Sequence, residues 1–328
     1  MAIRVGLVGA GGIGGYHFDQ LRKYMAKHPG TVEIVGVADV AVERAAELAK
    51  RADAKAYGSH VEMYDQEKPQ AVFVGIPPFA HADQEISAAE RGIHIFVQKP
   101  PAVTMEKARE IQAVITRSGV ISAVGFQDRY LDVVDEARAS LEGQRVGLAM
   151  GYWMGGMPGV PWWRVRAQSG GQAVEQTIHI FDTARYLFGE AVSVEGAATS
   201  GLMRDVPNYD VDDASAMTIK FQNGVLCTIF SACFLKGAPG KAGLDVYAQD
   251  VRVEYALRSR VRVSRGAETR EVNHRNDNDL ECVATFLEAV QSGNPVAIRS
   301  PYVDAVKSLA LPLAGEQSIR SGQSVQLK

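Results

Sequence analysis

The sequence predicts an α/β protein, with an N-terminal doubly wound parallel sheet of the Rossmann type followed by an α+β domain on an open mixed or antiparallel sheet. Through the first 126 residues, short apolar segments alternate with helical patterns, and a glycine-rich turn follows the first segment. This alternation is typical of a parallel sheet with helices on both faces. After Phe126, strand-like segments follow one another with few helices between them. We therefore expect domains at residues 1–126 and 127–328.

The first domain is predicted to contain strands at residues 3–9, 32–38, 71–76, 94–98 and 120–125. Helical patterns lie near residues 14–27, 41–52, 80–91 and 104–118. Ligands of doubly wound sheets bind beyond the carboxyl ends of the strands. The residues that follow these strands are therefore the first candidates for a site.

The second domain is predicted to open with a helix near residues 130–142. Strands are then expected at residues 145–154, 191–201, 214–222, 225–234, 243–249, 251–257, 260–265 and 268–273. Asn223-Gly224 indicates a hairpin, because both residues tolerate positive φ. Further helices are expected near residues 172–188, 279–292 and 302–321, and the last is a candidate to pack back on the first domain.

The composition indicates a soluble globular chain. Of 328 residues, 46% are hydrophobic and 22% are charged, and the formal net charge of −3 gives no footprint for nucleic acid. Three cysteines lack metal-ligand spacing, so we expect buried thiols, no metal and a cytoplasmic protein. Neither a signal peptide nor a bilayer-spanning run is visible, and no membrane partner is expected.

A glycine-rich turn follows the first predicted strand. Its first glycine permits a tight turn, its second lets the backbone approach a pyrophosphate, and its third lets helix pack closely on strand. The N-terminus of the following helix presents free N–H groups and a positive dipole end to phosphates. Because the flanking strand and helix both fit, we predict a dinucleotide contact at Gly9, Gly11, Gly12, Ile13 and Gly14.

Asp39 ends the second predicted strand. A carboxylate at this point accepts hydrogen bonds from the adenosine ribose hydroxyls and repels a 2′-phosphate. Ala41 supplies no counter-charge, so we predict NAD rather than NADP, although Arg44 could turn toward a 2′-phosphate. The alternative interpretation of Asp39 is a loop or helix N-cap residue.

Two further predicted strands are followed by candidate cofactor contacts. Ile76 and Pro77 begin a proline-shaped loop that can lie along a dinucleotide. His81 is either a cofactor contact or a polar residue that opens the next helix. Gln98 and Lys99 follow the next strand, where we expect Lys99 to lie beside the nicotinamide as an acid–base group. Taken alone, Lys99 would instead be interpreted as a surface lysine.

The second domain offers a matching set of polar residues in the predicted helix at residues 172–188. Glu175, His179 and Asp182 are spaced to project from one helical face. A carboxylate beside a histidine orients the ring and tunes its acid–base behaviour. Taken alone, the helix also permits the less favoured alternative of a structural, hydrogen-bonded histidine.

Together these motifs resemble the Gfo/Idh/MocA oxidoreductases, relatives of glucose–fructose oxidoreductase and inositol dehydrogenase. The resemblance covers essentially the whole chain and rests on Gly9, Gly11, Gly14, Tyr16, His17, Asp39, Pro77, Lys99, Pro100, Gly171, Glu175 and His179. It implies a bound NAD(H) or NADP(H), redox chemistry at a sugar or cyclitol hydroxyl carbon, Gln127 near the nicotinamide, and homo-oligomers paired through the C-terminal sheet.

Two residues depart from the family pattern. The family usually has Glu-Lys-Pro, and here Gln98 replaces the glutamate. It often has aspartate where this chain has Glu175. Loss of a charge beside Lys99 changes its electrostatics, and the longer Glu175 moves a carboxylate by roughly one bond length. Both departures bear on the identity of the substrate.

Aromatic and basic residues precede the glycines at 170–171 and suit the faces and hydroxyls of a sugar ring. The tryptophans could equally pack between domains. We predict substrate contacts from Arg129, Trp162, Trp163, Arg164, Gln176 and His179.

The sequence therefore predicts an NAD(H)-dependent oxidoreductase that acts on a polyhydroxylated small molecule as a homodimer or homotetramer. His179 or Lys99 would be the main base, and Glu175 would orient His179 or bind an adjacent hydroxyl. One alternative is a redox-neutral enzyme that uses retained NAD for epimerisation or elimination. The other is a sensor that binds dinucleotide without turnover.

Overall fold

The computed structural model describes residues 2–327, which divide into two compact units. The first consists of the residues up to Ala102 together with Glu106–Gln127 and Asp277–Val306. The second consists of Val103–Met105, Asp128–Asn276 and the residues from Lys307 onward. Each unit is described by itself. Within residues 2–327, no helix combines the length and apolar character needed to cross a membrane.

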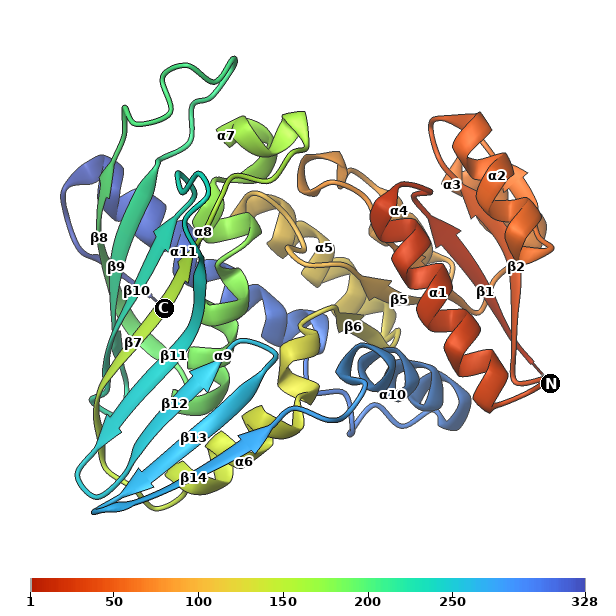
Figure 1. The fold of residues 1–328 in the computed structure, drawn as a ribbon. Helices are drawn as coiled ribbons and strands as arrows, with labels where there is room; N and C mark the ends of the chain where they lie inside the picture. The colour runs from red at the N-terminus through yellow and green to blue at the C-terminus, as the bar shows by residue number, and fades with distance from the viewer. Residues whose placement is uncertain (1, 328) are drawn as a thin grey trace. The chain divides into compact units, whose positions relative to one another are not determined.

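The first unit is a parallel sheet with the strand order β3-β2-β1-β4-β5-β6, in which every neighbouring pair is parallel (Figure 1). This order confirms the predicted doubly wound sheet. Its central strands are buried on both faces, as expected when helices cover both. The strands are β1 (Ile3–Val8), β2 (Val32–Ala38), β3 (Lys55–Tyr57), β4 (Ala71–Val74), β5 (His94–Val97) and β6 (Ser122–Val124).

Helices α1 to α5 connect these strands, and a later segment joins them. The strand β3 and the helix α3 were not predicted, because only Tyr57 of the three strand residues is buried. The later helix α10 packs on α1, and Ser300 Oγ donates a hydrogen bond of 2.7 Å to the Val124 carbonyl in β6. The helices are α1 (Gly12–Lys27), α2 (Val42–Ala52), α3 (His60–Glu67), the short η1 (Pro78–Ala80), α4 (Gln84–Glu90), α5 (Met105–Ser118) and α10 (Asn278–Ser292). The short η2 (Gln127–Tyr130) begins at the last residue of this segment, and its other residues belong to the second unit.

The second unit contains a nine-stranded mixed sheet with the order β14-β13-β12-β11-β7-β10-β9-β8-β15. Among the described strands of this sheet, only β7 and β10 pair in parallel, so the predicted mixed sheet is confirmed. The strands are β7 (Val146–Met154), β8 (Ala191–Thr199), β9 (Ala214–Phe221), β10 (Leu226–Ala232), β11 (Lys241–Ala248), β12 (Arg252–Ala256), β13 (Arg260–Arg265), β14 (Glu268–Asn273) and β15 (Val325–Gln326).

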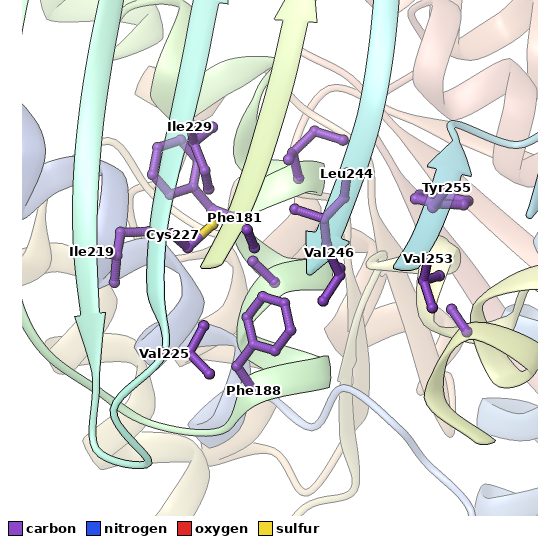
Figure 2. Packing of buried hydrophobic residues seen from close by; sticks show 14 of the residues in the cluster. Phe181, Phe188, Ile219, Val225, Cys227, Ile229, Leu244, Val246, Val253 and Tyr255 are labelled. Atoms are coloured by element: carbon purple, nitrogen blue, oxygen red, sulfur yellow. The ribbon is translucent and has the colours of Figure 1, made fainter. Parts of the chain in front are cut away.

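One face of this sheet carries the core of the second unit (Figure 2). Phe181 and Phe188 project from α9 among Ile229, Leu244 and Val246 of the sheet, and α6 and α11 add further apolar residues to the same cluster. Period-two alternation in the strands supplies these inward side chains. The helices of this unit are α6 (Asp132–Leu141), η3 (Pro161–Arg164), α7 (Arg166–Ser169), α8 (Gln172–Glu175), α9 (Ile178–Phe188) and α11 (Tyr302–Ser321), whose first turn belongs to the first unit.

The Asn-Gly hairpin is present, but its turn differs from the prediction. β9 and β10 are antiparallel neighbours, and the Gly224 N–H donates to the Phe221 carbonyl. Gly224 has a φ of +88°, whereas Asn223 is not among the positive-φ residues. The connection is therefore a loop with one left-handed glycine rather than a turn with positive φ at both residues.

The helix predicted at residues 172–188 is interrupted, which corrects the predicted geometry of its polar residues. α8 ends at Glu175 and α9 begins at Ile178. At the break, the Thr177 N–H donates to the Gln172 carbonyl five residues earlier, and Ser231 Oγ donates to the Thr177 hydroxyl at 2.9 Å. Glu175 and His179 therefore do not lie one turn apart on a continuous helix.

Candidate functional site

The glycine-rich turn joins β1 to α1 at the carboxyl edge of the parallel sheet. Gly9 has a φ of +95°, and a Cβ there would lie 2.4 Å from the Gly75 oxygen. A Cβ on Gly14 would lie 2.0 Å from the Gly9 oxygen. These two positions therefore accept only glycine without a backbone shift, as the sequence predicted from tight turning and close helix packing.

The space beside the turn fits a dinucleotide phosphate. A Cβ on Gly11 or Gly12 would meet no atom within 4 Å, so backbone N–H groups there are open to a ligand. α1 begins at Gly12 and runs for 16 residues, which gives its N-terminus a positive dipole end. Ile13 is 41% exposed beside this opening. Open backbone, a helix N-terminus and free space together fit the pyrophosphate of NAD.

Asp39 lies one residue beyond β2 and is held rigidly. Its carboxylate accepts hydrogen bonds from the Ala10 N–H at 2.7 Å and the Ala41 N–H at 2.8 Å, and it pairs with Arg44 at 3.0 Å. Burial would raise the pKa of Asp39, but these backbone hydrogen bonds and the Arg44 guanidinium outweigh burial and lower that pKa. The carboxylate is thus kept ionised next to the glycine turn, and Arg44 is directed at Asp39.

The remaining candidates in the first unit follow β4, β5 and β6. Ile76 and Pro77 lie directly before η1, at the carboxyl end of β4. His81 is buried before α4 and hydrogen-bonded to Glu85. Lys99 is partly exposed beyond β5. Gln98 and Gln127 are both buried.

Gln98 and Gln127 line a cavity of about 10 Å³ inside the first unit, together with Tyr16, His17, Phe96, Gly125, Asp279, Cys282 and Val283. Among the described residues neither ring nitrogen of His17 has a hydrogen-bond partner. Burial lowers the pKa of His17 to about 3, so its ring is neutral. A cavity of this size suits one water molecule, and His17, Gln98 and Gln127 are polar residues in its otherwise largely apolar wall.

His179 is the centre of a polar cluster in the second unit, in which His179 and Asp128 are buried and the Arg258 side chain is 37% exposed. Its Nδ1 lies 3.4 Å from Asp128 Oδ2, and Arg258 Nη2 lies 3.4 Å from both ring nitrogens. Arg258 Nε donates to Asp128 Oδ1 at 2.6 Å. Trp153 of β7 stacks on the imidazole, with ring centroids 5.9 Å apart. The four side chains come from η2, α9, the β12–β13 turn and β7.

Glu175 is positioned by a tryptophan. Its Oε2 accepts a hydrogen bond of 2.7 Å from Trp163 Nε1, and the Trp163 ring is 1% exposed in a cluster with Val211 and Cys233. Trp163 therefore packs inside the unit and gives no exposed wall for a sugar ring. The carboxylate that the structure places at His179 Nδ1 is Asp128, which corrects the expectation that Glu175 orients the ring by helical spacing.

Arg129 is also placed in the interior. It is 3% exposed and forms a two-pronged ion pair with Asp182, at 2.9 and 2.6 Å. Ser308 of α11 donates to the same carboxylate at 2.6 Å. Arg129 and Asp182 thus fasten α9 to η2 and α11, and we assign Arg129 a structural role instead of the predicted substrate contact.

The other predicted substrate contacts lie around η3 and the α8–α9 break. Trp162 is partly buried against the cluster of Trp163, and Arg164 Nη1 donates to the Pro207 carbonyl at 3.3 Å. Gln176 Oε1 accepts a hydrogen bond from Gln172. Trp162, Arg164 and Gln176 are each partly exposed. Within residues 2–327, His, Cys, Asp and Glu do not gather in groups of three able to hold a metal.

Sequence reasoning missed Asp128 and Arg258. Asp128 lies between Gln127 and Arg129, which the sequence analysis did select. Its partners His179 and Arg258, however, are 51 and 130 residues further along the chain. Arg258 does have an unusual backbone conformation, a φ of +53° in a residue other than glycine, but nothing in the sequence indicates this φ. No spacing rule connects residues 128, 179 and 258.

The fold and the glycine turn define an NAD-binding oxidoreductase. Residues 3–126 match the family described as "Oxidoreductase family, NAD-binding Rossmann fold", and residues 143–254 match the "GFO/IDH/MocA C-terminal domain". The chain belongs to the Gfo/Idh/MocA oxidoreductase family, which confirms the resemblance seen in the sequence.

Several dehydrogenases are similar to this chain over most of its length. It is 26% identical to scyllo-inositol 2-dehydrogenase (NAD(+)) of Bacillus subtilis (strain 168), over 99% of this chain and 96% of that protein. It is 30% identical to inositol 2-dehydrogenase of Rhizobium meliloti (strain 1021), over 81% and 75%. A levoglucosan dehydrogenase in complex with NADH and levoglucosan shares its fold, with a TM-score of 0.88 at 19% identity and 99% coverage of both chains.

Proposed function

We propose that this chain transfers hydride between NAD(H) and a hydroxyl carbon of a sugar, cyclitol or related polyol. The named relatives act on inositols, which supports this substrate class. The observation that carries the proposal is His179, a buried imidazole with the Asp128 carboxylate at its Nδ1. An imidazole held in this way is suited to accept a proton from a hydroxyl group.

The first unit supplies the cofactor site. NAD when bound supplies the hydride acceptor, and this chemistry belongs to the cofactor. Backbone N–H groups at the turn would hold the pyrophosphate, and Asp39 would accept the ribose hydroxyls and repel a 2′-phosphate. The residues proposed to contact NAD are Gly9, Gly11, Gly12, Ile13, Gly14, Asp39, Ile76, Pro77, Gln98, Lys99 and Gln127.

The second unit supplies the proton acceptor. A neutral His179 would take the hydroxyl proton at Nε2 in oxidation, and the Asp128 carboxylate, 3.4 Å from Nδ1, would stabilise the imidazolium that forms. In reduction the same nitrogen returns the proton. Lys99 would donate a hydrogen bond to the substrate oxygen and stabilise the developing alkoxide. Trp162, Arg164 and Gln176 are the proposed contacts to the rest of the substrate.

The domain roles follow from these assignments. We propose that residues 1–126 bind the cofactor and that residues 127–328 bind the substrate and a second copy of the chain. Leu148, Leu226 and Phe230 lie on neighbouring strands of the nine-stranded sheet and are 39–43% exposed, which supports pairing into a homodimer or homotetramer. All three cysteines are buried thiols, which suits the cytoplasm.

The test is a turnover screen of inositols, sugars and sugar alcohols with NAD and NADP, followed by alanine variants. We expect NADH to form with at least one cyclitol or sugar, and Lys99→Ala and His179→Ala each to lower kcat by about 100-fold or more. Lys107→Ala, which replaces a surface lysine of α5, serves as a matched control for Lys99. Near-wild-type turnover in both active-site variants would contradict the proposal.

A further inference from the structure

Arg258 occupies an unusual position for an arginine. It lies in the turn between β12 and β13 with a φ of +53°, a conformation that costs energy for a residue other than glycine. Its backbone N–H donates to the Tyr255 hydroxyl at 3.2 Å, which holds the turn in place. The turn directs the guanidinium at Asp128 and His179 at once.

The distances show how charge is shared in this cluster. Arg258 Nε lies 2.6 Å from Asp128 Oδ1, whereas His179 Nδ1 lies 3.4 Å from Asp128 Oδ2. The carboxylate is therefore closer to the guanidinium than to the imidazole, and much of its charge is balanced by Arg258. A cation beside a histidine disfavours the protonated ring, and a carboxylate favours it. Arg258 therefore opposes the pull of Asp128 toward a protonated ring.

We propose, on the basis of the proposed function, that Arg258 is a positioning residue that keeps the imidazole of His179 neutral and able to accept the hydroxyl proton. In oxidation the O–H and C–H bonds of the substrate carbinol would break and its C=O bond would form, with the proton bonding to His179 Nε2 and the hydride, with its electron pair, accepted by bound NAD. The imidazolium so formed and the Arg258 guanidinium then compete for Asp128. This competition favours release of the proton and restores the neutral base.

Three further side chains of the second unit, Asp182, Tyr255 and Trp153, contribute no uncompensated charge near His179. Asp182 lies on the same helix but is bound in the ion pair with Arg129. Burial raises the pKa of Tyr255 far above its usual range, so its hydroxyl stays neutral. Trp153 stacks on the ring without charge. Asp128 and Arg258 are thus the charged side chains of the second unit for which a contact with the His179 ring has been described above.

The experiment titrates His179 directly in the folded, cofactor-free full-length chain. Carbon-13 labelled histidine gives one NMR signal for each ring, and His179→Gln identifies the signal that belongs to residue 179. The variants are Arg258→Gln, which removes the charge, Arg258→Lys, which keeps it, and Asp128→Asn. Arg260→Gln is the control, since Arg260 begins β13 two residues after Arg258 and pairs with Glu271 of β14. Circular dichroism checks that each variant is folded.

We expect Arg258→Gln to raise the pKa of His179 by about one unit or more, because repulsion is lost and Asp128 is freed. Asp128→Asn should lower it, while Arg258→Lys and Arg260→Gln should leave it near the wild-type value. A pKa unchanged in folded Arg258→Gln would overturn the proposal.

The pH profile of kcat/KM separates this proposal from the proposed function. If His179 is the base, the acid limb of the oxidation profile should move to higher pH in Arg258→Gln, by the same amount as the NMR pKa. A shift in the NMR pKa without a shift in the profile would leave the role of Arg258 intact and reject His179 as the base.

Discussion

The glycine turn of the first unit and the His179 cluster of the second are built in opposite ways. Backbone alone shapes the glycine turn, where a Cβ on Gly14 would lie 2.0 Å from the Gly9 oxygen. The cluster is made of side chains from distant segments, and its charges are compensated pair by pair. The cofactor site should therefore be sensitive to added atoms, and the proton-transfer site to altered charge.

The largest effect is expected in the framework behind the His179 cluster. Arg129→Met leaves the Asp182 carboxylate buried and unpaired, and breaking a buried pair in this way costs about 3–5 kcal/mol. We expect the free energy of unfolding in urea to fall by this amount. Arg51→Met, which removes an exposed pair with Asp19, should change it by less than about 1 kcal/mol. Equal effects would show that the Arg129 pair is not a framework element.

The second prediction concerns the glycine turn. Gly14→Ala forces a backbone shift beside the phosphate site, because the clashing atom is the Gly9 carbonyl oxygen. Overpacking costs about 1–3 kcal/mol, so NAD binding should weaken by about 10- to 100-fold in calorimetry. Gly15→Ala is the matched control, since its Cβ meets no atom within 4 Å. If both variants bind NAD equally well, the close approach at Gly14 is unimportant.

The third prediction uses charge at the cofactor site. Asp39→Asn keeps the size of the side chain but removes the carboxylate that accepts from Ala10 and Ala41. A hydrogen bond to a charged group is worth about 1.5–3 kcal/mol, and part of it remains with the amide. We expect KM for NAD to rise by about tenfold and the preference over NADP to narrow. An unchanged ratio of NAD to NADP efficiency would remove Asp39 from the cofactor site.

The smallest effect is a pH dependence in α11. Burial, together with the charge of Asp212, raises the pKa of Glu316 to about 7 despite its contact with Arg166. The folded protein thus holds a proton that the unfolded chain releases near pH 4.5, so this contribution to stability is lost as pH rises from 4.5 through 7. Between pH 5 and pH 8, the Tm of Glu316→Gln should fall less than that of the wild type. Parallel Tm curves would contradict this.

These two regions also differ in how far the sequence could predict them. Gly9, Gly14 and Asp39 act within one strand–turn–helix unit, where local rules set the geometry. Asp128 and Arg258 meet His179 only because η2 and the β12–β13 turn are brought together by tertiary folding. At the helix break before Ile178, Thr177 is likewise hydrogen-bonded to Ser231 of β10, which is distant in the sequence. The prediction of one continuous helix through residue 177 was therefore wrong.

NAD-dependent oxidation with His179 as the base is tested most directly by NADH release. NADH is followed during turnover of a cyclitol or sugar by the wild type and by His179→Ala. We expect NADH to form in amounts equal to the oxidised product, and the rate of NADH formation to be about 100-fold or more lower in His179→Ala. Conversion of substrate with no NADH released would indicate a redox-neutral enzyme. Tight NAD binding without turnover across the whole panel would instead indicate a sensor, and either result would contradict the account.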